Sequence, residues 1–208
     1  MNMLLQGLHK LVGKPPCVLC QLSPAHRHSV CQDCWSNLPW NQEMIHRQEL
    51  NIIAACEYRY PMDRIIQQFK YEQQLQFQTL LAGSLICKKL PRVQAIVPMP
   101  ISQERLVERG FNQSVLIAQQ LARQLNTPVW QPIIRQHQHA QKGLSRVERL
   151  EGIHQQFKID SRIQTRYRKV LIIDDVVTTG SSVKALTEQL ENIGCKQIHI
   201  ACLAAAKI

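Results

Sequence analysis

The residues from 170 to 182 combine the side chains needed to hold a phosphorylated sugar. Four apolar residues, Val170–Ile173, lead into two adjacent carboxylates, Asp174 and Asp175, and Thr178–Ser182 supplies Thr, Gly and Ser side chains. Ligands of parallel α/β sheets bind beyond the carboxyl ends of the strands. A loop of small residues that opens a helix offers backbone N–H groups and the positive end of the helix dipole to a phosphate. The carboxylates suit the vicinal hydroxyls of a sugar, or a Mg²⁺ ion bound between them and phosphate oxygens.

The structural alternative for this run is a turn rich in capping residues, with both acids in solvent. Two Asp residues placed directly behind four apolar strand residues favour the binding site over the solvated turn. The run is not a Walker loop, because the Gly-Lys-Ser/Thr ending of that motif is absent.

Four of the eight cysteines form two closely spaced pairs, with two residues inside each pair and ten between the pairs. They are Cys17, Cys20, Cys31 and Cys34. Each pair can fold as a knuckle that points two thiolates at one centre, so two knuckles supply the closed tetrahedral shell of a structural Zn²⁺ site. A metal would also stabilise a segment too small to bury its own core. His26 or His28 could replace one thiolate, although four cysteines already complete the shell.

The other four cysteines stand alone, and we expect them to be small buried apolar residues. They are Cys56, Cys87, Cys195 and Cys202. The chain has no apolar run of the ~20 residues that a membrane span needs. Its first residues also lack the apolar core of ~7–15 residues that an export signal carries. We therefore expect a cytoplasmic protein. Its cysteines should then be thiols rather than disulfides, because the cytosol keeps thiols reduced.

Positive charge is concentrated in the second half of the chain. The formal net charge is +10, and the stretch from Arg92 to Lys169 holds thirteen basic and five acidic residues. A basic stripe of this kind suits a polyphosphate substrate or nucleic acid, and the alternative is a surface that serves solubility. Four aromatic residues near the paired cysteines could stack on the bases of single-stranded DNA, or they could be core residues of a small module. They are Trp35, Trp40, Tyr58 and Tyr60.

Strands and helices are expected to alternate from Pro39 onward. The expected strands cover residues 51–60, 94–97, 129–134, 170–173 and 197–203. The expected helices begin near Pro61, cover 75–90, run from Asn112 or Ser114 to Leu125, and cover 182–193. Residues 135–157 are expected to form a mobile loop with some helix. This alternation predicts an α/β fold with a mostly parallel sheet and helices on both faces. We expect a small zinc module at residues 1–48 and a larger domain at 49–208.

The run from Val170 to Ser182 resembles the phosphoribosyl pyrophosphate (PRPP) binding motif of type I phosphoribosyltransferases at every position. The resemblance implies that Asp174 and Asp175 are catalytic residues that hold the ribose, with Mg²⁺ bound together with PRPP. It also implies a set of residues around the 5′-phosphate: Thr178, Thr179, Gly180, Ser181 and Ser182.

Further blocks resemble the ComF/GntX family over nearly the whole chain. In order after the cysteines they are Tyr60–Met62 with Phe69 and Lys70, Val97–Pro100, Arg109–Gln113, and Gly143 to Arg149, followed by the acidic pair. That family joins an N-terminal zinc ribbon to a phosphoribosyltransferase-like domain and is associated with natural competence and DNA uptake. The resemblance makes Arg105 and Arg109 candidate pyrophosphate ligands. A flexible basic cover would come from residues 135–149, in which Lys142, Arg146 and Arg149 recur at helical spacing. The alternative for these three residues is a solvated helix face.

Two function classes follow from these residues and resemblances. The favoured hypothesis is a DNA-uptake accessory protein that binds single-stranded DNA and a PRPP-type ligand during natural transformation, with components of the uptake machinery as partners. The alternative is an active phosphoribosyltransferase that transfers ribose 5-phosphate from PRPP to an unidentified acceptor. A third hypothesis is a sensor of PRPP without catalysis, because fold and motif do not fix function.

Overall fold

The structure is a computed structural model that describes residues 14–136 and 156–206. The chain divides into two compact units, Met1–Leu38 and Pro39–Ile208, so the division precedes the boundary expected at residue 48. None of the helices within the described ranges has the length and apolar character of a membrane-spanning segment.

The first unit is built from tight turns and one short helix. Helix α2, Gln32–Ser36, begins after Cys31, whose Sγ atom accepts a hydrogen bond from the backbone N–H of Cys34. Antiparallel bridges join Pro16 to Pro24 and Arg27 to Val30. Few side chains are buried in this unit, which agrees with a segment that depends on a metal for stability.

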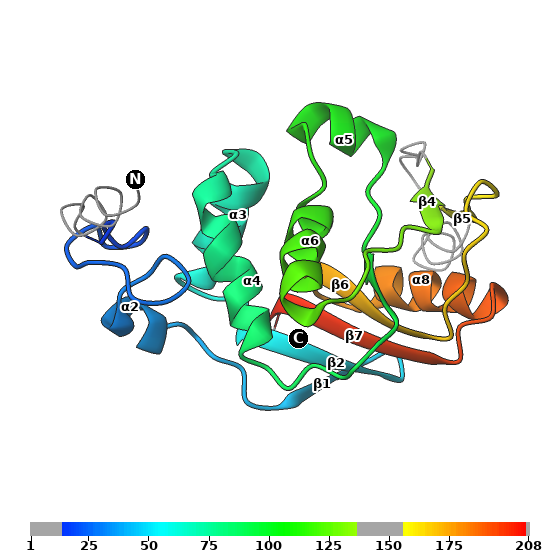
Figure 1. Cartoon of the computed structure of the whole chain (residues 1–208), viewed down its shortest axis with the longest axis horizontal. Helices are drawn as coiled ribbons and strands as arrows, with labels where there is room; N and C mark the ends of the chain where they lie inside the picture. The colour runs from blue at the N-terminus through cyan, green and yellow to red at the C-terminus, as the bar shows by residue number, and fades with distance from the viewer. Residues whose placement is uncertain (1–13, 137–155, 207–208) are drawn as a thin grey trace, which may run out of the picture. The chain divides into compact units, whose positions relative to one another are not determined.

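The second unit contains a five-stranded sheet in the order β1-β2-β7-β6-β3 (Figure 1). Its strands are β1 (Met44–Arg47), β2 (Leu50–Glu57), β3 (Ala95–Pro98), β6 (Lys169–Val177) and β7 (Gln197–Ala205). Strands β2, β7, β6 and β3 run parallel, and β1 is an antiparallel edge strand. The mostly parallel sheet predicted from the sequence is therefore confirmed.

Helices cover both faces of this sheet. The helices of this unit are α3 (Met62–Tyr71), the 3₁₀ helix η1 (Leu75–Phe77), α4 (Gln78–Ile86), α5 (Gln103–Arg109), α6 (Gln113–Leu125) and α8 (Ser181–Asn192), and α5 stands away from the sheet (Figure 1). Helix α8 packs with Val170 and Ile172 in one hydrophobic cluster. Leu171 and Ile173 are also fully buried, and they point to the opposite face because side chains alternate along a strand. Helices α4 and α6 contact each other and the sheet strands.

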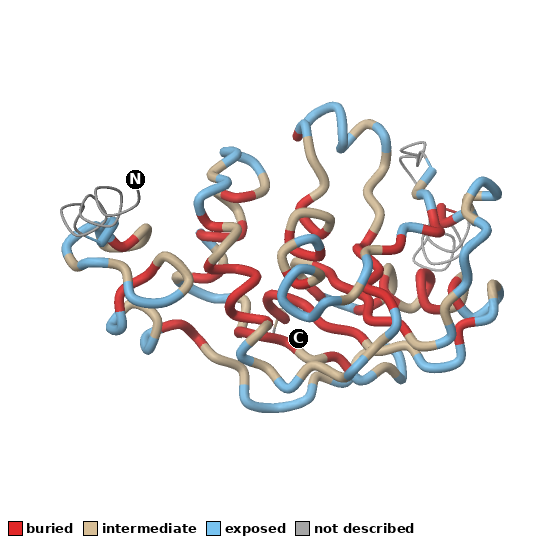
Figure 2. Tube along the Cα trace, viewed as in Figure 1, coloured by how far each residue is buried: buried red, intermediate tan, exposed pale blue. Residues whose placement is uncertain are grey.

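The core follows the central strands, as Figure 2 shows in red along β6 and β7. Residues 170–174 of β6 and 200–205 of β7 are all buried. Near-continuous apolar runs of this kind are typical of parallel strands covered on both faces.

The structure departs from the sequence expectations at several elements. Strand β1 and helix α5 were not predicted, and the helix expected over 75–90 is split into η1 and α4 and ends at Ile86. The strand expected over 129–134 is a single bridge at Val129 followed by β4 (Ile133–Arg135), which pairs with β5 (Phe157–Ile159). The loop expected over 135–157 lies mostly outside the described residues.

Cys87 corrects another expectation, because its side chain is exposed rather than buried. It follows α4 as the C-cap residue, where the chain leaves the sheet. Cys56, Cys195 and Cys202 are buried, as expected.

Candidate functional site

Strand β6 carries both predicted carboxylates and continues past them. The strand was expected to stop at Ile173, but Val176 and Val177 still pair with Ala204 and Ala205 of β7. Asp174 and Asp175 are therefore strand residues, and their side chains leave opposite faces of the sheet. The two acids have different surroundings for this reason.

Asp174 lies on the same face of β6 as Val170 and Ile172 and is 9% exposed. Burial, and then the charge of Asp175, raise the pKa of its carboxyl to about 7, against the opposing effects of a backbone N–H, Lys70 and Arg135. The backbone N–H of Asp175 donates a hydrogen bond of 2.8 Å to Asp174 Oδ1. This carboxyl consequently changes its charge near neutral pH.

Asp175 forms an ion pair with Lys70, which the C-terminal end of helix α3 supplies. The distance from Lys70 Nζ to Asp175 Oδ2 is 2.8 Å. The other carboxylate oxygen, Oδ1, accepts a hydrogen bond of 2.6 Å from the backbone N–H of Val176. Both oxygens of Asp175 are thus engaged within the chain.

The loop after β6 leads directly into helix α8 and lines a pocket of about 120 Å³. Its walls are Asp174 and the continuous run from Val176 to Val183. Gly180 is the N-cap residue of α8 and has a φ of +82°, a left-handed conformation that glycine adopts without strain. No side chain caps this helix, whereas Asn112 caps α6 through its side-chain oxygen. The first turn of α8 therefore presents N–H groups that suit a phosphate.

Arg109, one of the two predicted pyrophosphate ligands, is held by contacts within the chain. The side chain is largely buried, its guanidinium carbon lies 4.8 Å from the ring centre of Tyr71, and Nη2 donates to the Tyr71 hydroxyl at 3.3 Å. Its buried Nε atom has no hydrogen-bond partner among the described residues. An unpaired charged donor of this kind is costly unless an anion completes it. Arg105, one turn earlier on α5, is exposed.

Arg135 of β4 is related to the site through its electrostatic interaction with Asp174. Its Nε and Nη2 atoms both donate to Gln156 Oε1, at 3.1 and 3.0 Å, and its guanidinium lies over the ring of Phe157. Burial lowers the pKa of Arg135, the charge of Arg105 lowers it further, and Asp174 raises it. Arg135 is therefore electrostatically coupled to both Arg105 and Asp174.

Each carboxylate of the acidic pair offers oxygen ligands of the kind that a divalent cation takes, but the two leave opposite faces of β6 and offer them separately. The raised pKa of Asp174 reflects burial and the like charge of Asp175. A bound cation would relieve that repulsion, and carboxylate oxygens are the ligands that Mg²⁺ prefers.

The paired cysteines meet in the first unit, as their spacing predicts. The four Sγ atoms of Cys17, Cys20, Cys31 and Cys34 lie within 4.8 Å of one another. The distance between the Sγ atoms of Cys20 and Cys31 is 3.8 Å, which is close to the edge of a tetrahedron with Zn–S bonds of ~2.3 Å. Burial and the other three thiols raise the pKa of Cys34, whereas at Cys17 the effect of burial is outweighed by hydrogen bonds from the backbone, which lower its pKa to about 6. A shared cation would favour the thiolate form of all four together.

Neither predicted alternative ligand joins this cluster, which among the described residues consists of the four cysteines. His26 is exposed, and the ring of His28 lies 5.0 Å from that of Trp35.

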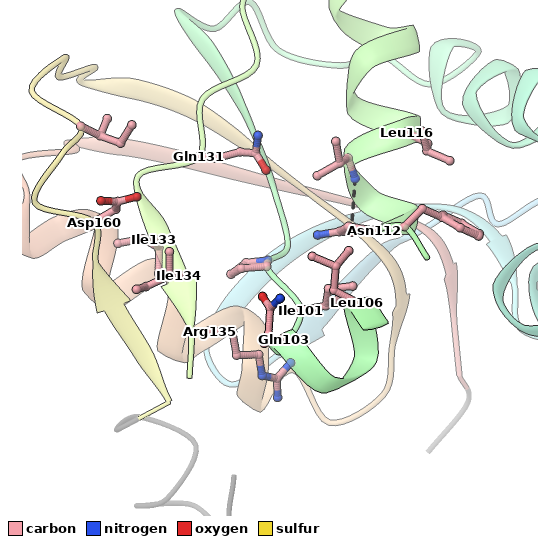
Figure 3. Close-up of a pocket in the computed structure, with 14 residues that line it drawn as sticks. Ile101, Gln103, Leu106, Asn112, Leu116, Gln131, Ile133, Ile134, Arg135 and Asp160 are labelled. Carbon is pink, nitrogen blue, oxygen red and sulfur yellow. Dashed lines mark hydrogen bonds between the residues drawn. The ribbon is translucent and has the colours of Figure 1, made fainter. Parts of the chain in front are cut away.

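A second and larger cavity, of about 570 Å³, is lined by residues of α5, α6 and β4 and the segments next to them (Figure 3). Ile133 and Ile134 form one side, and Leu106 and Leu116 form the other. Arg135 lines this cavity and also interacts electrostatically with Asp174, so it links the two sites. Nothing in the sequence pattern predicted the cavity, because its walls come from four separate stretches, residues 100–106, 111–116, 131–135 and 160–163.

Comparison with known proteins places the chain in a class and a family. A model described as "Phosphoribosyl transferase domain" matches residues 112–208. Solved structures similar to the chain include the glutamine PRPP amidotransferase of B. subtilis, at 13% identity and a TM-score of 0.46, covering 66% of this chain and 30% of that chain. They also include a purine phosphoribosyltransferase of Pyrococcus horikoshii, at 20% identity and a TM-score of 0.31, covering 74% and 77%. The second unit is thus a type I phosphoribosyltransferase-like α/β domain.

The family is defined by relatives that match almost the full chain. Competence protein F of Haemophilus influenzae is 31% identical over 99% of this chain and 91% of its own length. DNA utilization protein YhgH of Escherichia coli is 29% identical over 91% and 84%. Competence protein ComFC of Streptococcus pneumoniae is 28% identical over 88% and 76%. The chain belongs to the competence protein F (ComF) family.

Sequence reasoning missed the roles of Lys70, Tyr71 and Arg135 as individual site residues. Lys70 appeared within a recognised block, but nothing local shows that it meets Asp175 across the fold. The predicted basic cover at Lys142, Arg146 and Arg149 lies outside the described residues.

Proposed function

We propose that this protein is a DNA-uptake accessory protein that binds a PRPP-type ligand and single-stranded DNA during natural transformation. The observation that carries the ligand is the β6–α8 junction, where the uncapped N-terminus of α8 and the carboxylate of Asp174 line one small pocket. The names of the relatives, competence protein F and DNA utilization protein, support the DNA-linked role.

In this proposal the 5′-phosphate binds the loop from Thr178 to Ser182 through backbone N–H groups and hydroxyls. Asp174 and Asp175 bind the ribose hydroxyls. Arg109 and the exposed Arg105 bind the diphosphate, and the unpaired Nε of Arg109 supports an anion there. Mg²⁺ bound with the ligand would neutralise diphosphate charge, and a carboxylate of the acidic pair would supply one of its oxygen ligands.

Single-stranded DNA is proposed to bind through the excess of basic residues, with uptake components as partners in the cytoplasm. Exposed tyrosines support stacking contacts, because Tyr60 is 76% exposed and Tyr71 is 61% exposed. Reduced thiols suit the cytosol, and all eight cysteines are free.

The test is fluorescence anisotropy of a labelled single-stranded oligonucleotide, titrated with protein across a salt series, with and without PRPP and Mg²⁺. We expect binding that weakens steeply with salt and an affinity that changes when PRPP is added. DNA affinity equal to that of a neutral control protein would refute the DNA role.

An active phosphoribosyltransferase is the second candidate, and the cavity in Figure 3 favours it. Its apolar walls and the side-chain amides of Gln103 and Gln131 suit a flat, partly polar acceptor, and Arg135 links it to Asp174. Release of pyrophosphate from labelled PRPP, measured with pooled nucleobases, nucleotides and single-stranded DNA, separates the two candidates. Acceptor-dependent release would support the enzyme.

A further inference from the structure

Lys70 is attached to the acidic site by one direct contact. Its ammonium lies 2.8 Å from Asp175 Oδ2, and the two side chains are only 15% and 14% exposed. Asp175 Oδ1 accepts from the Val176 N–H, so each oxygen of this carboxylate has one donor within the chain and lone pairs remain for a ligand. A sugar hydroxyl or a divalent cation that binds Oδ2 would compete with Lys70 for that oxygen.

The end of helix α3 is anchored on both sides of Lys70. Phe69 is fully buried, and its ring centre lies 5.6 Å from that of Phe111. Tyr71 is covered by the guanidinium of Arg109. Three consecutive helical residues point in three directions, so they contact three different parts of the site. Lys70 can therefore leave Asp175 by rotating its flexible four-carbon stem, without any movement of the helix.

An anion bound at Arg109 would offer a second partner to the freed ammonium. Arg109 contacts Tyr71 and Phe111 contacts Phe69, so the chain around Arg109 packs against both neighbours of Lys70. The buried Nε atom of Arg109 lacks a partner among the described residues, and an anion that completes it would bind near the end of α3 that carries Lys70. Breaking a largely buried ion pair is costly when one partner is left alone, but the cost is offset when both groups find new partners.

We infer that Lys70 is an exchanging counterion: it holds Asp175 in the ligand-free site and transfers to a diphosphate oxygen when a ligand engages Asp175. The inference rests on the proposed PRPP site and adds a positioning residue to it. Lys70 would then have opposite effects on the two ligand components. It competes with a cation for Asp175, and it attracts the diphosphate.

The experiment compares Lys70→Met, which keeps the length of the stem, with Lys70→Arg, which keeps the charge. Arg64→Met is the matched control, because Arg64 is an exposed cation on the same helix. Calorimetry measures the dissociation constants of Mg²⁺ alone, of inorganic pyrophosphate, and of PRPP with Mg²⁺ for each full-length protein. Circular dichroism melts report the stability of each variant.

We expect Lys70→Met to bind Mg²⁺ alone about tenfold more tightly and to bind pyrophosphate and PRPP about tenfold more weakly, which is the size expected for one close charge contact. Lys70→Arg should restore the parent values for both anions, and Arg64→Met should match the parent throughout. Equal dissociation constants in Lys70→Met and the parent would overturn the inference. It would also be overturned if Lys70→Met bound all three ligands more weakly and melted at a lower temperature. Absence of PRPP binding by the parent would refute the PRPP site, while the Mg²⁺ and pyrophosphate titrations would still decide the exchange.

Discussion

Replacing Asp174 with Asn should stabilise the protein above neutral pH. The pKa of Asp174 is about 7 in the folded chain against an ordinary value of 3.8, with burial as the largest cause. An acid whose folded pKa is raised binds its proton more tightly in the folded state. The free energy of unfolding therefore falls as pH rises from about 4 to about 7, and it is lowered by the full amount above pH 7.

The size of this effect follows from the shift. Each pKa unit corresponds to about 1.4 kcal/mol, so a shift of roughly three units lowers the free energy of unfolding by up to about 4 kcal/mol at pH 8. Asn has the same shape and no charge, and it removes this penalty. Asp175→Asn differs, because it leaves the ammonium of Lys70 without its partner and costs roughly 1–3 kcal/mol. Relief of the repulsion on Asp174 offsets part of that cost.

Urea denaturation followed by circular dichroism at pH 5.5 and pH 8 measures these differences. At pH 8 we expect Asp174→Asn to be more stable than the parent, and Asp175→Asn to be less stable than Asp174→Asn. The stability of Asp174→Asn should also depend less on pH. If Asp174→Asn shows the parent's pH dependence and no gain at pH 8, the buried, proton-binding state assigned to Asp174 is wrong.

Three other perturbations test separate parts of the account. Purified protein should contain about one zinc per chain, and Cys31→Ser should lose the metal and unfold the first unit while the α/β domain stays folded. Metal analysis with circular dichroism checks this. Stoichiometric zinc in a quadruple Cys→Ser variant would refute the site. Gly180→Ala should weaken ribose 5-phosphate binding. The φ of +82° at this position costs a non-glycine residue about 1–2 kcal/mol, so the substitution should shift the loop. Unchanged affinity by calorimetry would contradict the phosphate assignment. Charge reversal of Lys142, Arg146 and Arg149 together should reduce the slope of DNA affinity against salt by about two units, and an unchanged slope would return these residues to a solvated face.

The sequence predicted the parts of the site that depend on local pattern. Strand β6, helix α8 and the Asn112 start of α6 follow from apolar runs and capping residues, and the cysteine cluster follows from spacing. Helix α5 was missed although Ser102 caps its start and Gly110, with a φ of +78°, ends it. Those two signals were available, but the charged residues between them show no apolar periodicity.

The remaining features depend on tertiary contacts that no local pattern shows. Pairing with β7 extends β6 past the carboxylates, and this places Asp174 and Asp175 on opposite faces. Lys70 reaches Asp175 only because α3 ends beside β6. The environment of Arg135 likewise depends on the β4–β5 pair, whose second strand has no distinctive sequence signal.

The most direct test of the central claim is a calorimetric titration of PRPP in the presence of Mg²⁺ into the parent protein and into Asp174→Asn/Asp175→Asn. The account predicts saturable binding to the parent at about one site per chain and its loss in the double variant. Ribose 5-phosphate should still bind the variant through the loop and the N-terminus of α8. A double variant that folds normally and binds PRPP as tightly as the parent would contradict the account and show that the acidic pair is not part of a phosphoribosyl site.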